Sequence, residues 1–212
     1  SAEGSATEKT PTPDNSSLEN ATGQHAAAGQ ETKKTTQDMR ASIAPWVSLV
    51  RTSLAKNKKY GPAVKYVQLA TVRSDMTPAV RTVVFRDFLP NTNFMYFITD
   101  ARTDKCQQLQ TNPSAEVCWY LPQSREQWRI RGHMHVVDES DSFGEGPEML
   151  RRRAIAWKNL SDNSRAQFTA AAPGKELHTA PFTGGETETS RESPPTSTFN
   201  MLYLEPFHVD HV

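Results

Sequence analysis

The sequence predicts a mainly β fold, an antiparallel β-barrel with flanking helices behind a disordered N-terminal tail. Runs of β-branched and aromatic residues about as long as typical strands follow one another along the chain. Close turns separate these runs, and helical periodicity appears in only a few segments. Consecutive short strands with close turns favour an antiparallel barrel over a parallel sheet with helical crossovers.

Composition divides the chain of 212 residues into a tail and one domain. Residues 1–41 are rich in Ser, Thr, Ala, Gly and Glu and have almost no large apolar side chains. Such a segment cannot bury enough surface to offset its chain entropy, so we expect it to be disordered. Residues 42–212 form the expected barrel domain, and residues 175–197, with little apolar content, form an expected long flexible loop.

Charge and cysteine content limit the possible partners. Lys and Arg total 24 and equal Asp plus Glu at 24, which argues against a nucleic-acid-binding surface. No apolar run approaches the roughly 20 residues that a membrane span needs, so we expect no membrane partner. Cys106 and Cys118 form no metal motif, and two thiols suit a reducing compartment without a structural disulfide. We expect a cytoplasmic protein, with an organelle as the alternative.

The elements follow in order along the domain. An amphipathic helix is predicted over 43–56, because Ile43, Trp46, Val47, Val50 and Leu54 recur at intervals of three and four. Strands are predicted at 66–73, 77–88, 94–99, 115–121, 126–137, 199–205 and 208–212, the last as a strand or edge. Helices are predicted at 104–110, 145–159 and 164–171.

Two arginines flank a strand-forming run, and a hydroxyl and lysine cluster follows the next strand. Arg81 and Arg86 enclose Thr82-Val83-Val84-Phe85, and Thr99, Thr103 and Lys105 lie in and after the following turn. Guanidinium, ammonium and hydroxyl groups at strand ends suit a phosphate. The alternative is a surface salt-bridge pattern on an ordinary hairpin, which spacing alone does not exclude.

Several motifs together resemble the pyridoxamine 5'-phosphate oxidase family. They are Leu69-Ala-Thr-Val72, Pro78, the stretch 81–88, the turn 99–105, Asn112-Pro113 and the stretch 125–132. Trp157, the stretch 160–165 and Pro173-Gly174 are similar to the branch described as an Alr4036-type FMN-binding domain. The resemblance covers roughly residues 43 to 212. It implies an FMN-binding split barrel that forms a homodimer with flavin at the interface.

The resemblance also implies roles for individual residues. Arg81 would contact the phosphate or ribityl end of FMN, and Thr103 and Lys105 would hold the phosphate. Thr82, Val83, Val84 and Phe85 would lie along the ring, mostly through backbone atoms. Arg86 would lie near flavin and substrate, Ile98 and Thr99 would flank the flavin, and Gln127 would reach the ring from the neighbouring subunit.

Two departures from the family pattern are visible. Asp104 stands where the oxidase proper has Arg, and an acid beside a phosphate weakens binding unless it points away. His211 falls near a flavin-contacting aromatic of the oxidase, and the family's terminal Arg-bearing element has no counterpart after it. Either the chain is truncated or the substrate side of the site is gone, so we do not expect authentic pyridoxamine phosphate oxidation.

The expected activity is flavin-dependent oxidation or reduction of a small molecule, with no catalytic acid or base assigned. The alternatives are a non-catalytic binding or assembly module with a degenerate flavin site, and a split barrel with another cofactor such as haem or a deazaflavin. His133 and His135 share one strand face, but no third ligand is evident and no metal is expected. Trp157 as a core anchor and Ser161 or Asp162 as a helix N-cap are the structural interpretation of the later motif.

Overall fold

A computed structural model describes residues 43–174 and 190–212. The expected disordered tail lies outside the described residues, as does most of the expected loop at 175–197. Its described part, 190–197, contains turns but neither helix nor strand.

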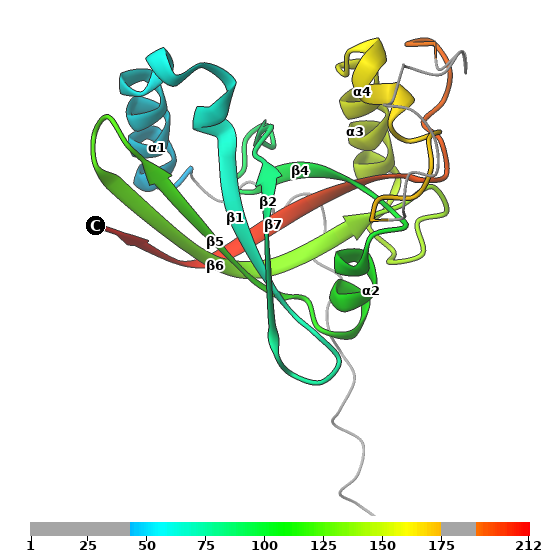
Figure 1. The fold of residues 1–212 in the computed structure, drawn as a ribbon, viewed down its shortest axis with the longest axis horizontal. Coiled ribbons are helices and arrows are strands. Elements are labelled where there is room, and N and C mark those ends of the chain that lie inside the picture. The colour runs from blue at the N-terminus through cyan, green and yellow to red at the C-terminus, as the bar shows by residue number, and fades with distance from the viewer. Residues whose placement is uncertain (1–42, 175–189) are drawn as a thin grey trace, which may run out of the picture.

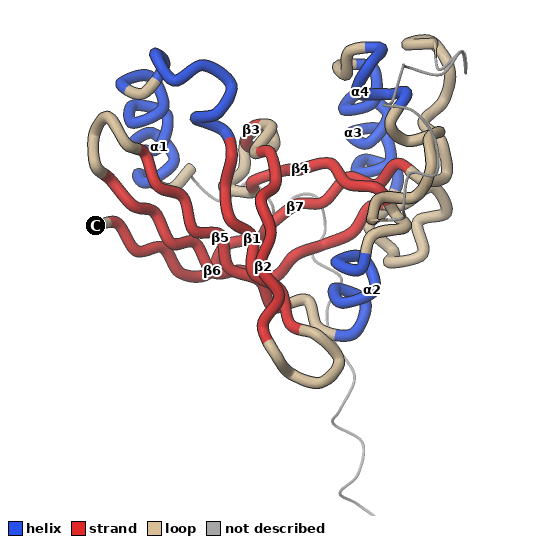
Figure 2. Tube along the Cα trace, viewed as in Figure 1, coloured by secondary structure: helices blue, strands red, loops and turns tan. Residues whose placement is uncertain are grey.

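A single seven-stranded antiparallel sheet dominates the structure, in the order β2-β1-β5-β6-β7-β4-β3. The sheet curls into a half-barrel flanked by helices (Figures 1 and 2), which confirms the predicted fold class. The strands are β1 Tyr66–Val72, β2 Pro78–Val84, β3 Asp87–Phe88, β4 Met95–Asp100, β5 Ser114–Leu121, β6 Glu126–Val137 and β7 Phe199–His211. The helices are α1 Pro45–Lys56, α2 Asp104–Thr111, α3 Pro147–Lys158 and α4 Asp162–Ala166, with a 3-10 segment, η1, over Lys58–Lys65.

The predicted single strand over 77–88 is wrong, because the chain changes partners within it. β2 pairs with β1 at one edge of the sheet, and β3 pairs with β4 at the other. Phe85 N donates to Lys65 O at 2.8 Å, and Arg86 N donates to Tyr96 O at 3.0 Å. Two consecutive residues thus bond to the segment before β1 and to β4, each next to an opposite edge strand of the sheet, which brings the two ends of the sheet together. β-propensity indicates extended chain but does not say which strand it pairs with.

The curled sheet has an apolar core on each face. The inner core lies on the concave side and is closed by α1, through residues that include Val47, Val50, Leu69, Phe85, Phe97, Trp119, Trp128 and Leu202. The second core lies under α3 and α4, on the opposite face of β4, β6 and β7, and includes Val137, Met149, Trp157, Phe168, Phe199, Met201 and Tyr203. Alternate residues of β7 enter different cores, as the two-residue period of a strand requires.

The end of the chain forms one strand where two were predicted. β7 continues through Pro206 because that residue lies opposite Gly132, at a register shift between Arg131 and Gly132 of β6. A proline is tolerated at such a bulge, where the ladder does not need its missing N–H.

The helix predictions hold in position but differ at their ends. α2 and α3 match the predicted ranges to within two residues, whereas α4 begins at Asp162 and ends at Ala166 instead of covering 164–171. Ser161 is the N-cap of α4 and accepts a hydrogen bond from Ser164 N, and Trp157 is fully buried, which confirms their structural roles. No helix in the described part of the chain has the length and apolar character needed to cross a membrane.

Candidate functional site

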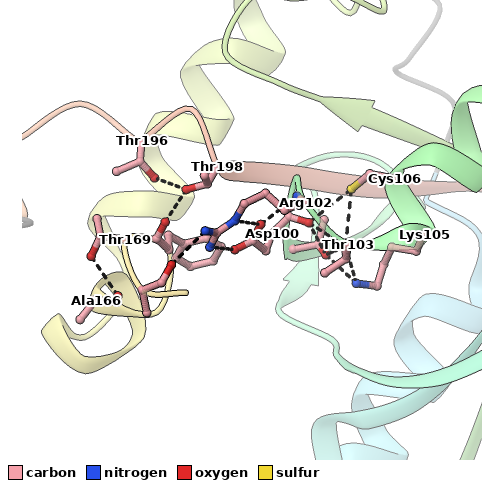
Figure 3. Close-up of polar contacts among 12 residues, drawn as sticks. Asp100, Arg102, Thr103, Lys105, Cys106, Ala166, Thr169, Thr196 and Thr198 are labelled. Carbon is pink, nitrogen blue, oxygen red and sulfur yellow. Dashed lines mark hydrogen bonds and ion pairs between the residues drawn. The ribbon is translucent and has the colours of Figure 1, made fainter. Parts of the chain in front are cut away.

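Two threonines and a lysine meet where β4 runs into α2. The Lys105 ammonium donates to Thr99 Oγ1 and to Thr103 Oγ1, each at 2.9 Å. Thr99 is at the end of β4, Thr103 is the N-cap residue of α2, and Lys105 lies in the first turn of that helix. Figure 3 shows Lys105 beside Thr103 and Cys106. The structure therefore brings together three of the predicted phosphate-site residues.

Arg81 reaches the same helix from β2. Its guanidinium donates to Thr71 Oγ1 at 2.5 Å, to Gln108 Oε1 at 2.9 Å and to Leu69 O at 3.3 Å. Thr71 also bonds Gln108, at 2.6 Å. Because Gln108 and Lys105 are three residues apart on α2, they share one side of the helix, which places Arg81 and Lys105 at a common site.

The electrostatics of this site favour an anion. Burial lowers the pKa of Lys105, and the nearby positive charge of Arg81 lowers it further. Burial likewise lowers the pKa of Arg81, and Arg73 adds to the effect. Neither Arg81 nor Lys105 forms an ion pair with a carboxylate among the described residues. Two partly desolvated cations beside hydroxyl groups are a suitable environment for a phosphate dianion.

Sequence reasoning missed Thr71 and Gln108. Thr71 lies on the same strand face as Leu69, and Gln108 lies one helical turn from Lys105. The two-residue period of a strand and the 3.6-residue period of a helix could therefore have indicated both residues. What sequence could not supply is the docking of α2 against β1.

The residues predicted to lie along a flavin ring are divided between surface and core. Thr82 is exposed and Val84 is half-buried, whereas Val83 packs against the inner core. Phe85 is 2% exposed, and its ring packs against Phe88, Phe97 and Trp119. Its side chain thus belongs to the fold, and only its backbone is available to a ligand.

Arg86 occupies the link between β2 and β3. Burial lowers its pKa, and the phenol of Tyr96 acts in the opposite direction. Its Nε is buried and has no hydrogen-bond partner among the described residues. A buried donor without a partner is costly, so this guanidinium is suited to receive an acceptor from a ligand.

Two predicted residues lie apart from the cluster. Ile98 packs against the second core, on the face opposite that of Thr99. Gln127 lies near the start of β6, and β1 and β5 separate that strand from β2. Thr99 pairs with Asn200 of β7, and the neighbouring residue Met201 pairs with Val137, at the end of β6. Along β6, that end is about 33 Å from Gln127. One chain therefore does not bring Gln127 to the site.

The two histidines considered as a metal pair have separate partners. His133 packs its ring against Phe207, whereas His135 bonds Glu145 and Glu205. Within 43–174 and 190–212, no group of three or more His, Cys, Asp or Glu side chains has metal-binding geometry. Cys106 and Cys118 are free thiols.

A curled antiparallel half-barrel with this cationic and hydroxyl cluster defines the class of FMN-binding split barrels. The sequence matches the family "Pyridoxamine 5'-phosphate oxidase, FMN-binding domain" over residues 43–138. It is 32% identical over 174 residues to the Arabidopsis thaliana protein named "Pyridoxine/pyridoxamine 5'-phosphate oxidase 2", covering 82% of this chain and 85% of that protein. The chain belongs to the pyridoxamine 5'-phosphate oxidase FMN-binding domain family.

Solved structures agree with this assignment. A pyridoxamine 5'-phosphate oxidase-related, FMN-binding protein from Nostoc punctiforme is 37% identical with a TM-score of 0.75, covering 81% of this chain and 86% of that chain. PhzG from Burkholderia lata, solved in complex with tetrahydrophenazine-1-carboxylic acid, is 19% identical with a TM-score of 0.58, covering 81% and 80%. The second similarity shows the fold alone.

Proposed function

We propose that this protein binds FMN and is a flavin-dependent oxidoreductase acting on a small molecule, in the Alr4036-type branch of its family. The two free thiols support a cytoplasmic location. The motif at Trp157, Leu160 and Arg165 supports the branch assignment.

The observation that carries the proposal is the pair of cations, Arg81 and Lys105, which have no carboxylate partner in the part of the chain that the structure describes. Arg81 would bind the FMN phosphate through its guanidinium, and Lys105 would add an ammonium charge. The Thr99 hydroxyl would donate its proton to the phosphate once Lys105 turns toward it. The Thr103 hydroxyl, which donates to Asp100 O, would accept from the Lys105 ammonium and help to hold it at the site. These donor groups match in chemistry what a phosphate monoester requires.

The flavin ring would lie beside the chain from Val83 to Arg86. That segment leaves β2 before joining β3, and the Arg86 Nε has no partner among the described residues. Bound FMN supplies hydride-transfer chemistry. The role of this chain is to bind and orient the ring and to hold a fixed positive charge near it at Arg86.

We also propose that the protein acts as a homodimer. Four large apolar side chains are exposed on the outer face of the sheet, namely Tyr66, Val80, Tyr120 and Phe207, at 48%, 64%, 54% and 63%. Such a concentration is typical of an interaction surface. A second copy would also supply Gln127 to the ring, a contact that one chain does not make.

The proposal is tested by purifying the protein without added cofactor, recording its visible spectrum and titrating it with FMN. We expect the two absorption bands of oxidised flavin, which vanish on reduction. The double variant Arg81→Ala/Lys105→Ala should lose FMN, whereas the control Lys58→Ala/Arg151→Ala, which alters exposed cations, should retain it.

Turnover is then assayed first with the 5'-phosphates of pyridoxine and pyridoxamine, the compounds in the name of the Arabidopsis relative. A protein that stays colourless at high FMN concentration contradicts the proposal and favours a non-catalytic split-barrel module.

A further inference from the structure

The Asp100 carboxylate is held by a two-pronged contact next to the Lys105 cluster. Arg102 Nε donates to Asp100 Oδ1 at 2.9 Å, and Arg102 Nη2 donates to Oδ2 at 2.6 Å. The backbone N of Arg102 also donates to Oδ1, at 2.8 Å. Asp100 is 8% exposed, so its carboxylate is shielded from solvent. Figure 3 shows the Arg102 guanidinium beside it. A planar guanidinium that binds both oxygens fixes the carboxylate in orientation as well as position.

The backbone of Asp100 in turn holds the residues of the proposed phosphate site. Its carbonyl oxygen accepts hydrogen bonds from Thr103 Oγ1 at 2.7 Å and from Thr103 N at 3.2 Å. Cys106 Sγ donates to the same oxygen at 3.5 Å. The backbone carbonyl of Asp100 therefore holds the Thr103 hydroxyl, which is one of the two that contact Lys105, while Arg102 holds the carboxylate of the same residue.

Arg102 is itself anchored to the segment that follows α4. Its Nη1 donates to Ala170 O at 2.9 Å. The neighbouring residue Ala101 donates its N–H to Thr198 O at 2.8 Å, and the Thr198 hydroxyl donates to Phe168 O at 2.5 Å. The guanidinium thus joins the turn after β4 to a segment about 70 residues further along the chain.

We propose that Arg102 is a positioning residue for phosphate recognition, which it serves by holding Asp100 so that Thr103 and Lys105 are in place before FMN binds. The inference rests on the proposed function. The guanidinium contacts Asp100 and Ala170, so its effect on the phosphate is transmitted through Asp100. Pre-organised groups bind more tightly because less ordering remains to be done on binding.

The test measures the dissociation constants of the apoprotein for FMN and for riboflavin, which lacks the phosphate, by quenching of flavin fluorescence. The variants are Arg102→Gln and Arg102→Lys, because lysine keeps the charge but cannot bind both carboxylate oxygens. Arg151→Gln is the matched control, an arginine whose side chain is 74% exposed and paired with Glu148 on α3. Near-UV circular dichroism establishes that each variant is folded.

We expect both Arg102 variants to lower the ratio of the riboflavin to the FMN dissociation constant by about tenfold, while the control stays within about twofold. An unchanged ratio in a folded Arg102 variant overturns the inference, as does an equal loss of affinity for both flavins. Failure of both variants to fold also overturns it, because Arg102 would then serve the fold as a whole. A wild-type protein that binds neither flavin overturns the proposed function and the inference with it. If the wild type binds FMN but the Arg102 variants have the same ratio of dissociation constants as the wild type, the inference is overturned and the proposed function stands.

Discussion

The ring of His135 lies parallel to the ring of Tyr203, with centroids 4.5 Å apart and an interplanar angle of 1°. His135 Nδ1 is 3.0 Å from Glu145 Oε1, and its Nε2 is 3.2 Å from Glu205 Oε2. The Tyr203 hydroxyl donates to Glu145 Oε2. Burial and Glu145 raise the pKa of Tyr203, so it stays protonated and remains a donor. This group ties the loop before α3 to β6 and β7.

The stability that His135 contributes should fall as pH rises. Burial acts to lower the pKa of His135, but Glu145 and Glu205 outweigh it and raise the pKa overall. A raised pKa means that folding favours the protonated ring. The contribution of His135 to the free energy of unfolding is therefore complete below the unfolded-state pKa of about 6.5. It is lost as the pH rises through the pKa of the folded state. At about pH 6 we expect His135→Gln to lower the free energy of unfolding by about 1–2 kcal/mol.

Urea unfolding at a series of pH values measures this contribution. The control is His133→Gln on the same strand, where the native ring is exposed and packs against Phe207. The difference between wild type and His135→Gln should shrink toward alkaline pH, and at about pH 6 it should exceed the difference between wild type and the control. A difference that grows with pH would contradict the expected sign.

Replacing Asp104 with Asn should strengthen FMN binding. Asp104 lies in the first turn of α2, and its charge acts on both Arg81 and Lys105. An exposed carboxylate near the phosphate repels it by a fraction of a kcal/mol, so the affinity should rise about two- to fivefold at low salt and less at high salt. Titration at two ionic strengths, with Glu139→Gln as the control for loss of an exposed acid, measures the effect. Weaker binding by Asp104→Asn would mean that this carboxylate orders the site.

Gly132→Ala should destabilise the sheet strongly. A Cβ at this position would overlap the carbonyl oxygen of Glu205 and lie 2.9 Å from Leu204 Cδ1. Because the obstruction is backbone of the paired strand, we expect a loss of about 3 kcal/mol in the free energy of unfolding. Gly144→Ala is the comparison: its φ is +69° but its surroundings are open, so strain alone should cost about 1 kcal/mol. Equal losses in the two variants would mean that the close approach of β6 and β7 relaxes easily.

Phe207→Asp should convert the proposed dimer to a monomer. Phe207 projects from the outer face of β7 with 63% of its surface exposed, and a buried carboxylate at an interface is strongly unfavourable. Light scattering after size exclusion should give half the mass, and FMN affinity should fall because Gln127 of the second copy is lost. The matched change Leu49→Asp, on the outer side of α1 with 51% exposure, should leave the mass unchanged. A wild-type protein that is monomeric at all concentrations would refute the dimer.

Local sequence patterns anticipated most of the fold and part of the site. Residue types and alternation located the strands, and the cluster of Thr99, Thr103 and Lys105 could be predicted because its members lie close together in the sequence, from the end of β4 to the start of α2. The bonds of Arg81 to Thr71 and Gln108 depend on strand register and on the docking of α2, which no local pattern encodes. The change of strand partner at Phe85 and Arg86 could not be predicted from the sequence for the same reason, because strand pairing depends on the whole sheet.

The position of β7 also bears on how the chain acquires its structure during synthesis. β7 pairs with β6 on one side and β4 on the other, although the other strands in the described part of the chain all precede it in the sequence. Until residues 199–211 leave the ribosome, the nascent chain holds two ladders, β2-β1-β5-β6 and β4-β3, which are linked at Phe85 and Arg86 and lack the strand that pairs with both β6 and β4. Strand edges left unpaired in this way recruit other chains, and distant pairings form slowly. The newly made protein is therefore expected to depend on chaperones until its final strand is inserted.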